Sequence, residues 1–329
     1  MITDLFSLLR ALTVRRIINY MMLRFSYLRA LMTGNYHISG LPASVSLEPV
    51  NFCNLHCPEC PAGKKELTRE TGELSLETYT KVVDQLHTNL ISILLYFQGE
   101  PYLHKNLFEM IRYARKYKIY VLTSTNGQFL TSVNARKTVE SGLNKLIISV
   151  DGTTQETYEQ YRINGKLSKV TEGIRQLAYW KKKLGKRTPV LEGQFLVFSH
   201  NEHQRQEFRK LGKEWGLNRV VFKSAQFYEP QNMQHMSPSA SKYIRYKGGK
   251  ELQLRRKIRN RCFRMWHSGV MTREGSWVPC CFDKDAKYVL GNMDTSSLQE
   301  IWFSKEYETF RKSVLSDRNS ISMCANCTE

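Results

Sequence analysis

The amino-acid sequence predicts an α/β fold. Six parallel strands are expected to form a partial (β/α)6 barrel, with an N-terminal helical extension and a small cysteine-rich C-terminal domain. The prediction rests first on short apolar runs that alternate with helical patterns from residue 45 to residue 222. Secondly, this alternation ends near residue 224, and five of the eight cysteines follow it. Six repeats are fewer than the eight of a closed barrel, so the barrel is expected to be partial.

Composition and charge restrict the class of protein. The chain has 329 residues, of which 41% are hydrophobic, and this suffices for a buried core. Its formal net charge of +19 predicts an anionic partner or substrate, without choosing among nucleic acid, a membrane surface and a phosphorylated metabolite. No apolar run reaches the length of a membrane span, and Arg10 interrupts the first apolar segment, which does not fit a secretory signal. A cytoplasmic location is therefore predicted.

The N-terminal extension, residues 1–40, is rich in Leu, Met and Arg and predicts one or two helices that end near Gly34-Asn35. On a helical projection its arginines scatter around the wheel. This favours a helix that packs against the main domain or a partner. Peripheral contact with the inner face of the membrane is the alternative.

The barrel domain is predicted to span residues 41–228. Its strands are expected at Val45–Glu48, Ile91–Phe97, Ile119–Thr123, Lys145–Val150, Val190–Phe198 and Arg219–Phe222. Its helices are expected at Leu76–Leu86 with Ser75 as N-cap, Asn106–Lys118, Val133–Ser141, Lys169–Leu184 and His203–Trp215. Parallel strands joined by helices bring the carboxyl ends of all strands to one rim, where active sites of such folds lie.

Two further segments follow the barrel. Residues 229–261 are predicted to be a basic linker, because Pro230 and Pro238 lie in a polar stretch and a run of Lys and Arg residues comes after it. Residues 262–329 are predicted to form a domain with one clear helix, Leu298–Val314. Such a short segment builds little core by itself, so a stabilising metal group is expected.

The strongest signal for chemistry is a loop of three cysteines directly after the first predicted strand. Cys53, Cys57 and Cys60 have the spacing C-x3-C-x2-C. Three thiolates on one loop can hold three corners of a [4Fe–4S] cluster and leave the fourth iron open for substrate or cofactor. A zinc site would need a fourth ligand, for which His56 is the local candidate.

This motif closely resembles that of the radical S-adenosylmethionine (SAM) superfamily. Gln98-Gly99-Glu100-Pro101 resembles the family's GGEP segment, with Gln98 in place of the first glycine, and implies contacts to the methionine amino group. Thr125-Asn126-Gly127 follows the third strand and Ser149-Val150-Asp151-Gly152 the fourth. The resemblance implies that SAM is bound by Gln98, Gly99, Glu100, Asn126, Ser149 and Arg162. The residue before the third cysteine, often aromatic in the family, is Glu59.

The C-terminal cysteines resemble the SPASM/twitch extension of many radical SAM enzymes. The full SPASM pattern has seven cysteines, and five are too few for two fully ligated clusters. One auxiliary [4Fe–4S] cluster is therefore expected, with Cys262, Cys280, Cys324 and Cys327 as ligands. Cys281 is left over, and an exchange of roles between Cys280 and Cys281 stays open. The alternative is a structural four-cysteine zinc ribbon.

The resemblance implies reductive cleavage of SAM to a 5′-deoxyadenosyl radical, which abstracts a hydrogen atom from the substrate. Because an auxiliary cluster can accept an electron, oxidation of a sugar or alcohol-type substrate is expected, with modification of a peptide or protein side chain as the alternative. The expected partners are a small-molecule or peptide substrate, with an anionic group as one option, and a low-potential donor such as flavodoxin or ferredoxin. RNA modification is disfavoured because no appended recognition module is visible. A non-enzymatic metal-binding protein would not explain the ordered SAM-like motifs.

Overall fold

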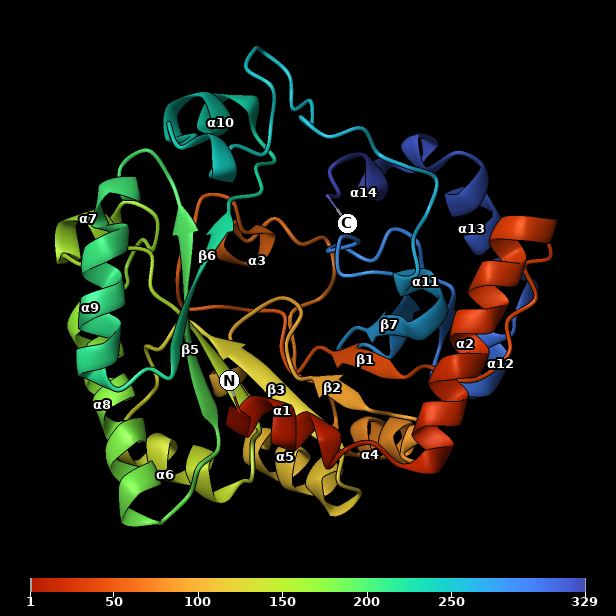
Figure 1. Cartoon of the computed structure of the whole chain (residues 1–329), viewed down its shortest axis with the longest axis horizontal. Coiled ribbons are helices and arrows are strands. Elements are labelled where there is room, and N and C mark those ends of the chain that lie inside the picture. Colours follow the sequence, from red (N-terminus) through yellow and green to blue (C-terminus); the bar gives the residue numbers. More distant parts are fainter. Residues whose placement is uncertain (1, 329) are drawn as a thin grey trace. The chain divides into compact units, whose positions relative to one another are not determined.

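The structure is a computed structural model that describes residues 2–328. The chain divides into two compact units. Unit 1 contains residues 2–4, 52–66 and 122–257, and unit 2 contains residues 5–51, 67–121 and 258–328. Figure 1 shows the elements of both units in an α/β fold with mostly parallel strands, as the sequence predicts.

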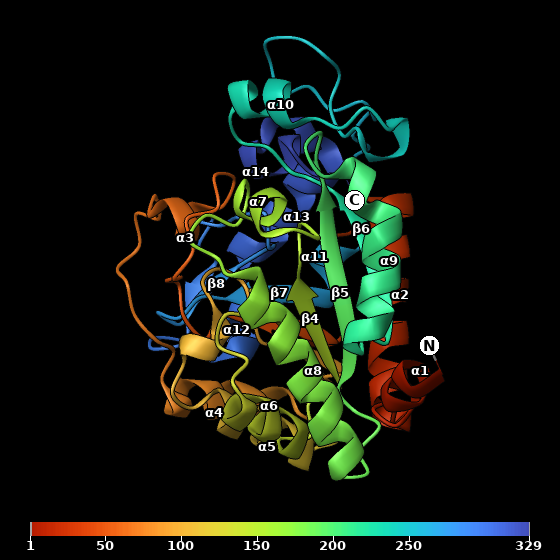
Figure 2. The ribbon, with the colours of Figure 1, turned by 90° about the vertical axis from the view of Figure 1, so that its left-hand side faces the viewer.

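Unit 1 holds the second half of the strand–helix alternation. Its strands are ordered β6-β5-β4-β3 and all run parallel. Helices α8 and α9 pack against each other and both lie beside β5, as Figure 1 and Figure 2 show. Its elements are α3 (Pro61–Lys64), most of β3 (Tyr120–Thr125), α6 (Ser132–Glu140), β4 (Lys145–Ser149), α7 (Gln155–Glu159), α8 (Leu167–Lys183), β5 (Val190–Val197), η2 (Glu202–Gln204), α9 (Arg205–Trp215), β6 (Arg219–Ser224), α10 (Pro230–Met236) and η3 (Ser241–Tyr243).

Unit 2 combines the first strands of the chain with the C-terminal segment. Its strand order is β2-β1-β7-β8-β9, in which β7 runs parallel to β1, and β8 and β9 are antiparallel. Its elements are most of α1 (Ile2–Leu9), α2 (Val14–Thr33), β1 (Ser44–Leu47), α4 (Leu76–Leu86), β2 (Ser92–Leu94), η1 (Pro101–Leu103), α5 (Leu107–Lys116), α11 (Arg264–His267), β7 (Ser268–Met271), β8 (Ser276–Val278), β9 (Gly291–Asn292), α12 (Leu298–Trp302), α13 (Lys305–Ser316), η4 (Arg318–Ser320) and α14 (Ser322–Ala325).

Capping side chains explain where several helices begin and end. The Ser75 hydroxyl accepts a hydrogen bond from the amide of Thr78, which confirms the predicted start of α4. Gly34 ends α2 with a φ of 68°, a conformation that glycine adopts without strain. The single helix predicted over Leu298–Val314 is instead two helices, because Ser304 caps a second one, α13. The segment predicted to be an irregular linker also contains α10, which begins at Pro230.

The C-terminal part of unit 2 has an aromatic core. Trp266, Trp277 and Trp302 are fully buried. Trp302 packs edge-on against Tyr307, with ring centroids 4.9 Å apart. The guanidinium of Arg311 lies over the Tyr307 ring at 3.8 Å from its centroid. This segment therefore has more core than its length predicts.

A buried arginine connects α2 to the rest of unit 2. The Arg16 side chain donates hydrogen bonds to the carbonyl oxygens of Ala11 (2.6 Å), His87 (2.7 Å), Tyr117 (2.8 Å) and Lys118 (3.4 Å). His87 and Tyr117 follow the last residues of α4 and α5, so the cation also meets the negative ends of two helix dipoles. Arg16 thus joins three helices of unit 2 through one side chain.

We expect Arg16→Met to destabilise the protein by roughly 3 kcal/mol, because it removes charge-assisted hydrogen bonds and leaves buried carbonyl groups unpaired. The exposed neighbour Arg15 supplies the matched control, since Arg15→Met should stay within about 0.5 kcal/mol of the parent. The measurement is denaturant unfolding followed by circular dichroism. Equal losses in the two variants would contradict this role of Arg16.

Candidate iron–sulfur and SAM sites

The three-cysteine loop lies in unit 1 and leads into the short helix α3. The amide of Cys60 donates to the Cys57 carbonyl at 3.2 Å, which closes a tight turn between these two cysteines. Gly63 lies against this turn, where a Cβ atom would come within 2.9 Å of the Cys57 nitrogen. A side chain at position 63 would therefore displace the backbone that presents Cys57.

His56 has a structural role in this loop. Its amide donates to the carbonyl of Ile163 at 3.2 Å, and its Nδ1 atom lies 3.1 Å from the carbonyl oxygen of Gly63. A ring nitrogen at this distance from a carbonyl oxygen donates a hydrogen bond to it and has no lone pair for a metal. The geometry therefore argues against a zinc site completed through Nδ1 of His56.

Nitrogen donors point at the sulfur atoms of the loop. Cys53 Sγ accepts from the amide of Leu55 at 3.5 Å and from Asn126 Nδ2 at 3.6 Å, and Cys57 Sγ accepts from Arg162 Nη1 at 3.5 Å. Such donors stabilise the thiolate form that ligates iron and tune the potential of an iron–sulfur cluster. The residues present thus fit a cluster with three cysteine ligands.

Apolar side chains enclose the loop within unit 1. Cys53, Cys57 and Cys60 pack against a cluster that also contains Leu55, Tyr161, Phe198, Ala225, Phe227, Met233 and Tyr246. Burial raises the pKa of the Cys57 thiol, and the nearby Arg162 partly offsets this. These walls restrict the access of water to the buried Cys57, whereas Cys53 and Cys60 are partly exposed.

Arg162 and Asp151 form a buried ion pair beside Cys57. Arg162 Nε donates to Asp151 Oδ2 at 2.6 Å. Burial of the guanidinium lowers its pKa, but Asp151 and Cys57 outweigh this effect, and the pKa of Arg162 is raised well above its usual value. Asp151 is itself fully buried and accepts from the amide of Leu196 at 2.6 Å. Asp151 therefore fixes the guanidinium that points at Cys57.

Glu59, at a position that is often aromatic in the family, holds another segment in place. Its carboxylate accepts from the amide of Tyr228 and from Asn232 Nδ2, both at 2.6 Å. Burial raises the pKa of Glu59, and these hydrogen bonds counteract the shift. The Glu59 side chain thus connects the cysteine loop to the start of α10.

The remaining SAM-binding candidates lie at the ends of strands or just after them. In unit 1, Ser149 ends β4, and Asn126 follows β3, whose last residue Thr125 is in register with Ile148. In unit 2, Glu100 is buried and caps η1 by accepting from the amide of Tyr102 at 3.1 Å. Gly99 has a φ of 70°, and Gln98 Nε2 donates to the Phe97 carbonyl at 3.1 Å.

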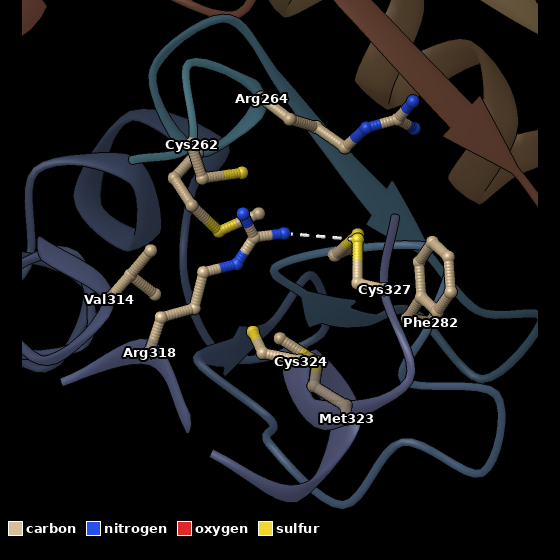
Figure 3. Close-up of a pocket in the computed structure, with 10 residues that line it drawn as sticks. Cys262, Arg264, Phe282, Val314, Arg318, Met323, Cys324 and Cys327 are labelled. Atoms are coloured by element: carbon tan, nitrogen blue, oxygen red, sulfur yellow. Dashed lines mark hydrogen bonds between the residues drawn. The ribbon is translucent and has the colours of Figure 1, made fainter. Parts of the chain in front are cut away.

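Four of the five C-terminal cysteines gather around one cavity in unit 2. Cys262, Cys280, Cys324 and Cys327 line one small cavity that is partly open to solvent. Figure 3 shows Arg318 among Cys262, Cys324 and Cys327, with its guanidinium directed at Cys327. Cys281 does not line the cavity, and its sulfur accepts a hydrogen bond from Arg264 Nη1 at 3.4 Å.

Arg318 is a buried cation within this cysteine set. Its Nη2 atom donates to Cys327 Sγ at 3.0 Å, and its Nη1 atom donates to the carbonyl of Arg261 at 2.9 Å. Burial raises the pKa of Cys324 to about 11, an effect that Arg318 reduces. A cation among four thiols lowers the cost of ionising them, so the residues present fit an iron–sulfur cluster with four cysteine ligands.

Two family models match the chain. The model described as "Radical SAM superfamily" matches residues 47–191, and the SPASM model, described as "Iron-sulfur cluster-binding domain", matches residues 262–328. The chain is a radical SAM protein with a C-terminal SPASM domain. These domains imply a SAM-binding [4Fe–4S] cluster, an auxiliary cluster and SAM itself.

Relatives of this radical SAM protein include proteins of similar length. The "tungsten-containing aldehyde ferredoxin oxidoreductase cofactor-modifying protein" of Pyrococcus furiosus is 23% identical over 324 residues, covering 86% of each chain. The "S-adenosyl-L-methionine-dependent 2-deoxy-scyllo-inosamine dehydrogenase" of Niallia circulans is 23% identical over 288 residues, covering 86% of this chain and 91% of the relative.

Solved structures confirm the fold. BtrN in complex with AdoMet and 2-DOIA has a TM-score of 0.53 and 19% identity, covering 89% of this chain and 95% of that chain. Streptococcus suis SuiB bound to the precursor peptide SuiA has a TM-score of 0.64 and 12% identity, covering 92% and 73%. Radical SAM proteins with small-molecule and with peptide ligands thus share this architecture.

Sequence reasoning missed the partners of the cysteine sites. Asp151 stood within a recognised motif, but only the fold brings it to Arg162. Arg318 belongs to no motif and lies nine residues before Cys327 in the chain. A basic residue a few positions before a cysteine pair is a weak signal for such a contact.

We expect Arg318→Gln to lower the reduction potential of the auxiliary cluster by on the order of 100 mV, because reduction adds negative charge that the guanidinium stabilises. Arg318→Lys keeps the charge and should retain most of the parental potential. The measurement is a redox titration followed by electron paramagnetic resonance, with iron content as the control. Equal potentials in the Gln variant and the parent would contradict the contact with Cys327.

Proposed function

We propose that this radical SAM protein is an oxidoreductase that oxidises an alcohol group of a sugar-like small molecule. The observation that carries the proposal is the combination of an auxiliary cysteine set in unit 2 with similarity along most of the chain to a SAM-dependent dehydrogenase. Four thiols around one cavity would ligate all four irons of a cluster and leave none open to substrate. Such a cluster would serve only to carry electrons. The net charge of +19 favours an anionic substrate, such as one that is phosphorylated or attached to a nucleotide or lipid.

In the first site, we assign Cys53, Cys57 and Cys60 as the ligands of the SAM-binding cluster. A reduced cluster held by these cysteines, together with SAM, would supply the radical chemistry that removes a hydrogen atom from the substrate carbon. Asn126 and Arg162 hold the sulfur ligands through N–H···S contacts. Gln98, Gly99, Glu100 and Ser149 are the further SAM-binding residues of the proposal.

In the second site, we assign Cys262, Cys280, Cys324 and Cys327 as the ligands of the auxiliary cluster. Oxidation of an alcohol to a ketone removes one hydrogen atom, one proton and one electron from the substrate. A cluster held by these four cysteines would accept that electron, and a low-potential donor such as flavodoxin or ferredoxin would supply the electron for cleavage of SAM. Arg318 would favour electron acceptance there, because its positive charge lies beside Cys327.

Iron content tests the two ligand sets. We expect about eight irons per chain after anaerobic reconstitution, and about half of that in the variant with Cys53, Cys57 and Cys60 replaced by Ala. Cys281→Ala is the matched control and should keep the parental iron, because Cys281 does not line the cavity. Unchanged iron content in the triple variant would disprove the first ligand set. Loss of iron in the control would assign Cys281, in place of Cys280, as a ligand of the auxiliary cluster.

Product analysis tests the oxidation. With a polyol deuterated at the reacting carbon, we expect deuterium in 5′-deoxyadenosine together with a ketone product. In the variant with Cys262 and Cys324 replaced by Ala, the ratio of ketone to 5′-deoxyadenosine should fall about tenfold or more, since hydrogen abstraction precedes loss of the electron. Circular dichroism must first show that the variant folds. Deuterium transfer only from peptide substrates would overturn the proposal in favour of side-chain modification.

A further inference from the structure

The outer face of α2 is apolar and exposed. Six of its residues follow a four-three spacing that places them along one side of the helix. These are Val14 (76% exposed), Ile18 (53%), Met21 (64%), Phe25 (65%), Leu28 (44%) and Met32 (76%). Ile17, Met22 and Leu31, also exposed, widen this outer face to about half of the helix circumference.

The inner face of the same helix is more polar than the outer one. Arg16, Asn19 and Ser26 are buried there beside Leu23, Tyr27 and Ala30. Asn19 exchanges hydrogen bonds with the backbone of Leu41, at 2.8 and 2.9 Å. A surface helix of a soluble protein has the opposite arrangement, with apolar residues inside and polar residues outside. The outer face of α2 therefore suits apolar surroundings that residues 2–328 do not provide.

The segment of chain that carries this face is basic. The sequence from residue 5 to residue 47 contains five arginines and no Asp or Glu. On the helix, Arg24 lies toward one margin of the outer face, and Arg15 and Arg29 lie toward the other. Arginines beside a broad apolar face are typical of helices that lie in the interface of an anionic bilayer.

We propose that the outer face of α2 docks on an anionic phospholipid surface, with the helix axis parallel to the membrane plane. No described helix is both long and apolar enough to cross a bilayer. The inner face of α2 is also occupied, because Tyr27 packs against Trp266 at a ring-centroid distance of 5.0 Å. The helix thus remains part of unit 2 while its outer face enters the headgroup region.

A second copy of the chain is a poorer occupant for this face. Paired helices of a coiled coil use a narrower apolar seam with complementary charges beside it. Two copies of α2 would instead bring arginine-bearing margins together without any carboxylate to pair with them. Anionic lipid headgroups supply the complementary charge that a second copy lacks.

Vesicle flotation tests the proposal with the full chain carrying both clusters. We expect the parent to float with vesicles of phosphatidylcholine and phosphatidylglycerol, to bind pure phosphatidylcholine much more weakly, and to lose affinity as salt rises. The variant Met21→Glu/Phe25→Glu should bind the anionic vesicles about tenfold more weakly or worse. The matched control is Val133→Glu on α6, at a position that is 62% exposed, and it should bind as the parent does.

Circular dichroism and iron content should be the same in the parent and in both variants, because only exposed side chains change. If the double Glu variant fails to fold, Val14→Ser/Met32→Ser at the two most exposed positions replaces it. A parent that does not float, or a folded variant that floats like the parent, would overturn the proposal. A dimer in analytical ultracentrifugation that the variant abolishes, without vesicle binding by the parent, would assign the face to a second copy.

Discussion

The ion pair between Arg162 and Asp151 is the interaction on which the cysteine loop most depends. A buried guanidinium is costly unless a carboxylate neutralises it, and Asp151 does so with a 2.6 Å contact. Asp151 is held in turn by backbone donation from Leu196 on β5, so the orientation of Arg162 follows from the register of β4 and β5. The strand arrangement thereby fixes a cation beside Cys57 through two hydrogen bonds.

Each cysteine set contains one buried arginine that donates to a sulfur atom: Arg162 to Cys57 in unit 1 and Arg318 to Cys327 in unit 2. Their environments differ, because Arg162 has a carboxylate partner, whereas Arg318 also donates to the backbone carbonyl of Arg261. The charge of Arg162 is therefore partly balanced by Asp151, whereas the contact that Arg318 makes with Cys327 is to a thiol.

The sequence was sufficient for features with a local signature. Strand–helix alternation, the Ser75 cap and the spacing of Cys53, Cys57 and Cys60 depend on residues near one another in the chain. The sequence could not predict contacts between residues that lie far apart in the chain. Glu59 stands where the family often has an aromatic residue, yet it accepts a hydrogen bond from the amide of Tyr228, which lies 169 positions later. Such a contact has no periodicity or motif, because it exists only after the strands between the two residues have paired.

Helix α2 also shows what the sequence alone could not predict, namely which of its side chains are buried. Projecting its arginines around the wheel treats them as equivalent, and on that basis they scatter without forming a basic face. The structure separates them by environment: Arg16 is buried and binds four backbone carbonyls, whereas Arg15 is exposed. Once Arg16 is removed from the surface, an apolar arc remains with the other arginines near its margins. Amphipathicity therefore has to be judged from the residues that stay on the surface after folding, since a buried charge contributes to stability and not to the interface.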